Sequence, residues 1–175
     1  RRAIAAGKQP ASLYLMLGAI ENMIPPLDTG LKRAQAAIDE GLAAHPDAVE
    51  LVQARYRVTR MSGDAEGARA FVEARTKDDP KGSFRRLLVD IDRDEGRYEQ
   101  AYAGVQSLLK DQPNDPALSL LLVRLVSARA VEAANRGDHQ SERKFNDEAS
   151  SLIRAFRAAN PDDARMLEAE AELAA

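Results

Sequence analysis

Few residues of this sequence have the types and the spacing that catalysis or metal binding requires. The only histidines are His45 and His139, and we expect both in turns far apart along the chain. Cysteine is absent, which excludes a disulfide or a thiolate-bound metal. The glycine-containing segment 63–67 lacks the Lys and the Ser or Thr that hold a phosphate. We therefore predict that the chain is not an enzyme and uses no cofactor.

The acidic run Asp90, Asp92, Asp94 and Glu95 has the alternation of a calcium-binding loop. Such a loop also needs Gly at its sixth position and Glu at its twelfth. Counting from Asp90, these positions hold Glu95 and Ala101, so the match fails. We interpret the run as carboxylates that solvate a helix end, and we predict no metal site.

Composition and charge favour helices and identify no partner. Of the 175 residues, 45% are hydrophobic, 30% are charged and only 5% are aromatic, which is typical of an all-α protein. The charges are mixed in sign and sum to a net charge of -3, so a nucleic-acid-binding protein is not indicated. The best apolar run, 118–126, contains Ser119 and Arg124 and is too short to span a bilayer. We expect no membrane insertion.

The first residues and the composition bear on the origin of the chain. It starts at Arg1-Arg2 without Met, from which we expect a piece of a longer protein. The lack of cysteine fits both the cytoplasm and the periplasm. The abundance of Ala, Arg and Asp suggests a bacterial protein.

Turn signals alternate with amphipathic segments along the chain. A glycine followed by a polar residue falls in polar breaks at 63–64, 96–97 and 137–138. Between the breaks, apolar residues recur at spacings of three and four, as at Val49 and Val52. The pattern predicts nine helices, at 11–24, 31–44, 47–62, 65–77, 82–95, 98–111, 116–136, 139–159 and 162–175.

A period of about 34 residues relates the second helices of the predicted pairs. In each of them an Ala is followed by an aliphatic residue on the same face and then by a Pro, twelve residues after the Ala. The alanines are Ala34, Ala68, Ala101 and Ala149, the aliphatic residues Ile38, Val72, Val105 and Ile153, and the prolines Pro46, Pro80, Pro113 and Pro161. Because a small residue lets two helix backbones approach closely, we expect the alanines at tight helix crossings.

Two intervals depart from the period. The last one, from Pro113 to Pro161, is 48 residues long, and we expect the surplus as added turns on both helices of the last pair, around 128–136 and 140–146. A smaller surplus near 24–26 should lengthen the inner loop of the first pair.

These features resemble the tetratricopeptide repeat (TPR) family, over nearly the whole chain. That family places an aromatic residue and Leu-Gly in the first helix of a pair, and a small residue, an aliphatic or aromatic residue and a closing Pro in the second. Tyr14 with Leu17-Gly18 matches the first part, and 63–80 and 96–113 match the second. Where the family usually has Gly, the later pairs have Tyr56, Val89 and Val123.

The resemblance implies an all-α, right-handed superhelical stack of antiparallel helix pairs, a TPR-like α-solenoid. The chain 1–175 would be one repeat domain of about four pairs and a C-terminal helix. The repeats would lie at roughly 11–46, 47–80, 81–113 and 114–161, and the last helix at 162–175.

The resemblance also implies a non-catalytic scaffold, because in this family the first helices of the pairs line a concave groove that binds a peptide or a partner protein. Carried onto this chain, the groove residues are Gln53, Arg57, Arg60, Arg86, Asp90, Arg93 and Arg124. Five of them are arginines, which can hold carboxylates bidentately, so we predict an acidic peptide or a C-terminal carboxylate as ligand. The alternative is that these arginines pair with neighbouring Asp and Glu and only solvate a helix face.

Two other functions stay open on the sequence. The chain would self-associate if it were a structural or oligomerising spacer in a larger assembly. It would regulate an enzyme if it were the helical domain of a protein whose catalytic part lies outside these residues.

Overall fold

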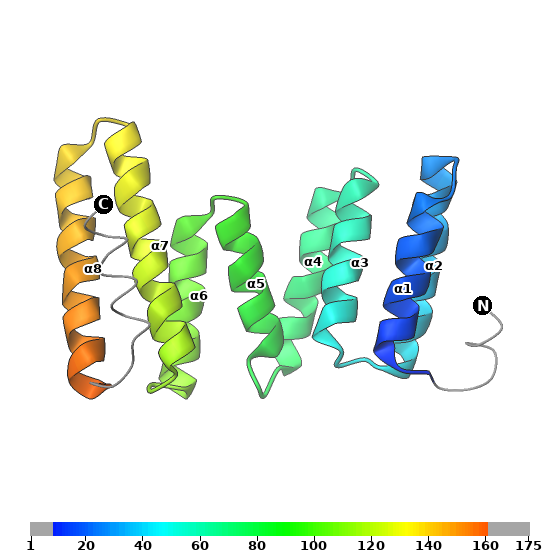
Figure 1. Cartoon of the computed structure of the whole chain (residues 1–175), viewed down its shortest axis with the longest axis horizontal. Helices are drawn as coiled ribbons and strands as arrows, with labels where there is room; N and C mark the ends of the chain where they lie inside the picture. The colour runs from blue at the N-terminus through cyan, green and yellow to red at the C-terminus, as the bar shows by residue number, and fades with distance from the viewer. Residues whose placement is uncertain (1–8, 161–175) are drawn as a thin grey trace. The chain divides into compact units, whose positions relative to one another are not determined.

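The computed structural model describes residues 9–160, which form eight α-helices and one short 3-10 helix and contain no strand (Figure 1). The elements are α1 Ala11–Met23, α2 Leu27–Ala44, α3 Val49–Met61, α4 Ala65–Arg75, η2 Thr76–Asp78, α5 Ser83–Asp94, α6 Tyr98–Asp111, α7 Pro116–Asn135 and α8 His139–Ala159. The protein is therefore all-α, as predicted. The predicted helix 162–175 and Pro161 lie outside the described residues.

The inner loop of the first pair is not lengthened, so that prediction was wrong. The loop is 24–26, as short as the inner loops 62–64, 95–97 and 136–138. The surplus residues lengthen α2, which begins at Leu27 behind two prolines and not at Leu31. Gly30, which precedes the predicted helix 31–44, lies inside the observed helix, at a place where α1 packs closely. A Cβ on Gly30 would lie 2.9 Å from the carbonyl oxygen of Glu21.

The added turns of the last pair are confirmed. Helices α7 and α8 have 20 and 21 residues, whereas α5 and α6 have 12 and 14. Neither α7 nor any other helix within 9–160 is long and apolar enough to cross a membrane.

Two hairpin loops close with the same backbone geometry, which explains their Gly-Asp sequence. Gly63 and Gly137 have φ values of 92° and 74°, a conformation that strains other residues. The N–H groups of the following Asp64 and Asp138 donate to carbonyls five residues back, at 3.3 and 2.9 Å, which ends the first helix. Each Asp side chain then accepts a backbone N–H of the second helix. Hydrogen bonds from the side chain and then from the backbone of Ser141 lower the pKa of Asp138.

The chain divides into two compact units, Arg1–Leu87 and Leu88–Ala175, with the boundary inside α5. In the first unit, α1 packs on α2 and α3, α2 also packs on α3, and α3 packs on α4. In the second unit, α6 packs on α7 and α7 on α8, and Val89 of α5 belongs to the same core as Ala101 and Val105 of α6. The single repeat domain over 1–175 stays a prediction.

The four repeat alanines are completely buried. Each has an exposed fraction of 0%, and the aliphatic residues four positions later are exposed by at most 2%. In the first pair, a Cβ on Gly18 of α1 would be in van der Waals contact with the carbonyl oxygen of Ala34, at 3.5 Å. Small side chains are therefore needed at these positions, since a larger one would displace the neighbouring helix.

A buried carboxylate holds the start of α5. The side chain of Asp79 is 3% exposed and accepts three backbone N–H groups, from Ser83 at 2.9 Å, Phe84 at 2.8 Å and Arg85 at 2.8 Å. These donors belong to the first turn of α5, where no intrahelical acceptor exists for them. Asp79 therefore fixes the direction in which the chain enters α5.

We expect Asp79→Ala to lower the free energy of unfolding by about 2 kcal/mol, because three buried donors lose a charged acceptor. Urea unfolding followed by circular dichroism measures the change. The matched control is Asp78→Ala, which removes the same charge from the exposed neighbour in η2. Equal stability of the two variants would contradict the role assigned to Asp79.

Candidate functional site

An exposed polar stripe runs along α3. Gln53, Arg57 and Arg60 follow one another at spacings of four and three, which places them on one face of the helix. Gln53 is half-buried and the two arginines are exposed. The stripe points outward because α3 buries other faces, which carry Val52 and Tyr56.

Arg57 differs from Arg55 and Arg60 of the same helix, which both have partners within the described residues. Arg55 donates from Nε to the Asp39 carboxylate at 2.7 Å, so its charge is neutralised within the fold. Within residues 9–160, Arg57 makes neither a hydrogen bond nor an ion pair. Its guanidinium is therefore available to a carboxylate from outside the described residues.

The same spacing recurs on α5, 33 residues later, at Arg86, Asp90 and Arg93. Here the alternative interpretation describes Arg93, which contacts the carboxylates of Asp90 at 3.3 Å and Asp94 at 3.0 Å. Arg86 also has an interaction within the described residues. Arg124 is exposed on α7. The predicted groove residues thus share one face within α3 and one face within α5. The groove that would join these faces stays a prediction.

The remaining acidic side chains of the α5 run are also engaged by an arginine. Asp92 is 3% exposed and accepts a hydrogen bond from Nε of Arg97 at 2.8 Å, and Arg97 also pairs with Glu95. In the part of the chain that the structure describes, no three His, Asp or Glu side chains are grouped as metal ligands would be. Through the ion pairs with Arg97, the acidic run attaches the end of α5 to the loop that follows it.

A stacked arginine in the second unit was missed by sequence reasoning. Arg129 of α7 lies over the Tyr102 ring of α6 at 4.9 Å and over the Phe145 ring of α8 at 4.2 Å. Its Nη2 donates to Glu99 at 2.6 Å. This residue joins three helices through cation–π contacts and one ion pair.

The first unit contains a related stack, and the sequence spacing could have revealed it. Arg55 lies 5.4 Å from the centre of the Phe71 ring, which also contacts Arg75 at 5.0 Å. In both hairpins the arginine stands eight residues before the loop glycine and the phenylalanine eight residues after it. An Arg and a Phe placed symmetrically about a hairpin glycine therefore meet across the pair.

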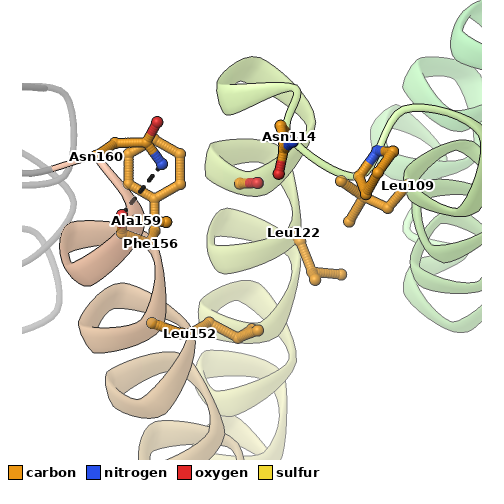
Figure 2. Close-up of a pocket in the computed structure, with 10 residues that line it drawn as sticks. Leu109, Asn114, Leu122, Leu152, Phe156, Ala159 and Asn160 are labelled. Atoms are coloured by element: carbon orange, nitrogen blue, oxygen red, sulfur yellow. Dashed lines mark hydrogen bonds between the residues drawn. The ribbon is translucent and has the colours of Figure 1, made fainter.

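A hollow of about 270 Å³ lies between α6, α7 and α8 in the second unit (Figure 2). Figure 2 shows Asn114 and Asn160 at one end, where α7 begins and α8 ends, and Leu122 and Leu152 further along. Most of the wall is apolar, and its larger side chains are Leu109, Leu122, Leu152 and Phe156. The hollow can take one bulky apolar group, with amides close to its mouth.

The comparisons with known proteins assign no family to this chain. No protein-family model matches it, and no curated protein or solved structure does. The likeness to tetratricopeptide repeats consequently stays a prediction from the residues.

The hydroxyl group of Tyr102 provides a test of the three-helix contact. It donates to Glu148 at 2.7 Å, and this hydrogen bond, together with burial and the Glu148 charge, raises the pKa of Tyr102 to about 12. A raised pKa means that the folded state favours the protonated phenol. Its contribution to stability is complete below the ordinary pKa of about 10 and is lost as the pH rises towards 12.

We expect Glu148→Ala to return the pKa of Tyr102 towards its ordinary value, because the acceptor and its charge are both removed. NMR titration of the tyrosine ring carbons measures the pKa, and Tyr102→Phe assigns the resonance. A Tyr102 pKa that is the same in Glu148→Ala and the wild type would contradict the contact.

Proposed function

We propose that this chain is a non-catalytic scaffold that binds an acidic peptide, or an acidic segment of a partner protein, along the exposed faces of its first helices. The observation that carries the proposal is the polar stripe of α3, with Arg57 free of any partner within residues 9–160 and Arg60 exposed beside it. The same spacing of polar residues recurs on α5, at Arg86, Asp90 and Arg93.

We propose a stack of helix pairs of the tetratricopeptide repeat type as the architecture. Three features support it: the buried alanine in the second helix of each pair, the inner loops of equal length, and the repeated closure by a left-handed glycine. In such an array each pair contacts only its neighbours, so the outward faces of the helices remain free for a ligand.

The chemistry of the stripe sets the strength and the salt dependence of binding. Each exposed arginine–carboxylate pair contributes roughly 0.2–1 kcal/mol, so one pair alone gives no useful affinity. Binding must therefore use several side chains together and must weaken as salt screens the charges.

The hollow of the second unit offers an apolar anchor for the same class of ligand. An aliphatic or aromatic side chain of the partner would contact Leu122, Leu152 and Phe156. Asn114 and Asn160 line the same hollow and can form hydrogen bonds with a peptide backbone there.

The first experiment compares fluorescein-labelled peptides of alternating Glu and Ser with peptides in which Gln replaces Glu. Fluorescence anisotropy should show tighter binding of the Glu peptide, weakened about tenfold in Arg57→Ala/Arg60→Ala, since two charge contacts are lost. The control Arg136→Ala removes an equal charge that is already paired with Glu132 at 2.7 Å, and it should bind as the wild type does. Equal binding of both peptides, or an unchanged double variant, would reject the basic stripe as the site.

The second experiment tests the apolar anchor. N-acetyl-leucinamide, titrated into labelled protein, should shift the amide resonances of Leu122, Leu152 and Phe156, which line the hollow. Ala155 also lines it, and Ala155→Phe should abolish the shifts by filling the space. The control Ala158→Phe places the same ring on an exposed position of α8 that does not line the hollow. Shifts that survive Ala155→Phe would exclude the hollow as an anchor.

A further inference from the structure

Three first helices bury a pair of apolar residues seven positions apart. The pairs, with their exposed fractions, are Leu51 at 0% with Val58 at 8% in α3, Phe84 at 6% with Ile91 at 6% in α5, and Leu118 at 1% with Leu125 at 0% in α7. Residues seven apart lie on one side of a helix, so each pair marks one buried face.

In α3 and α7 this face receives the second helix of the preceding pair. In the first unit, the Cδ1 atom of Leu51 lies 3.2 Å from the position that a Cβ on Gly41 of α2 would take. In the second unit, Leu118 and Leu125 share a core with Val105 of α6. We therefore name the face defined by these residue pairs the docking face of a first helix.

Helix α1 has the counterpart of this face. Its buried residues Tyr14, Gly18 and Glu21 correspond to Val52, Tyr56 and Thr59 of α3, with a constant offset of 38 positions. The same offset relates Leu51 and Val58 to Leu13 and Ile20. The docking face of α1 is thus Leu13 and Ile20.

The Ile20 part of this docking face is open to solvent, whereas Leu13 is partly buried. Ile20 is 54% exposed, although its counterpart Val58 is only 8% exposed. Met16 at 61% and Met23 at 81% lie four and three positions from Ile20 on α1, and Ile24 at 45% follows the helix directly, so together they extend the exposed apolar surface. These four residues form the apolar stripe of α1.

The stripe carries no charge. The one charged residue of α1 is Glu21, which is 7% exposed and pairs with Nε of Arg33 at 2.8 Å. The thirteen-residue helix therefore presents no unpaired charge, in a chain of which 30% is charged. A partner surface must be equally apolar and uncharged, because any unpaired charge placed there would lose its hydration.

We propose that a second copy of this chain covers the stripe, with the two α1 helices packed against each other about a two-fold axis. At such an axis each residue meets its own equivalent or a near neighbour, so an apolar stripe without charges is complementary to itself. The two methionines add flexible side chains that adapt to the opposing helix.

The area of the contact sets its strength. A helix of 13 residues is about 20 Å long, and covering one face of it on both copies removes on the order of 1,000 Å² of surface from water. That area is at the lower limit for a specific interface, so the dimer should be weak and reversible. The contact is independent of the peptide-binding stripe of α3.

The test is sedimentation equilibrium over a range of protein concentrations. The wild type should rise from the monomer mass of 19.1 kDa to twice that mass, whereas Ile20→Glu should remain monomeric because two carboxylates would meet at the axis. The control Met61→Glu changes a residue of α3 that is 56% exposed, and it should dimerise as the wild type does.

A charge-swap mixture separates the contact from misfolding. Ile20→Lys alone should also be monomeric, and an equimolar mixture of Ile20→Glu and Ile20→Lys should recover the dimer through opposite charges. The proposal is overturned if the wild type stays monomeric at all concentrations. A wild type that stays monomeric and instead binds a helix of another protein through the stripe also overturns it. It is also overturned if Ile20→Glu dimerises like the wild type, or if the mixture stays monomeric while both variants keep the wild-type circular dichroism.

Discussion

The close approach of paired helices at small residues is the constraint on which the rest of this structure depends. Ala34, Ala68, Ala101 and Ala149 have no exposed surface. At Gly41 and Gly104 a Cβ would come within 2.7 Å of Tyr14 and 2.5 Å of Val89, so the facing helices leave no room for a side chain. Two helices this close bury their apolar faces against each other, and their remaining faces point outward. Without that approach, each hairpin would lose the partner that buries its apolar stripe.

This constraint divides the arginines into two kinds. Arg55 and Arg129 lie between helices, stacked on Phe71 and Phe145 and paired with acids of a preceding helix. They hold hairpins together and are not available to a ligand. Arg57, only two positions after Arg55, points away from these contacts and makes no ion pair within residues 9–160. The position of an arginine on its helix, more than its sequence neighbourhood, therefore decides whether it is structural or free to bind.

Much of the local structure could be predicted from the sequence, because it depends on neighbouring residues. Glycines and prolines mark where helices end, and the surplus before Pro161 correctly predicted the longer α7 and α8. The start of α2 was predicted wrongly because the role of Gly30 depends on a neighbouring helix. This residue lacks a side chain where α1 approaches closely, and it does not mark a loop. The arginine stacks, the hollow at Leu122 and the open face of α1 depend on packing between separate helices, and we did not predict them.

The central claim is that paired helices meet at fully buried alanines, and Ala101→Leu tests this claim most directly. Enlarging a side chain at a helix crossing with no free space should lower the free energy of unfolding by about 1–3 kcal/mol. Ala103→Leu makes the same change at an exposed position of α6 and should leave stability nearly unchanged. If urea unfolding gives Ala101→Leu and Ala103→Leu the same stability, the helices do not meet at the small residues and the account is contradicted.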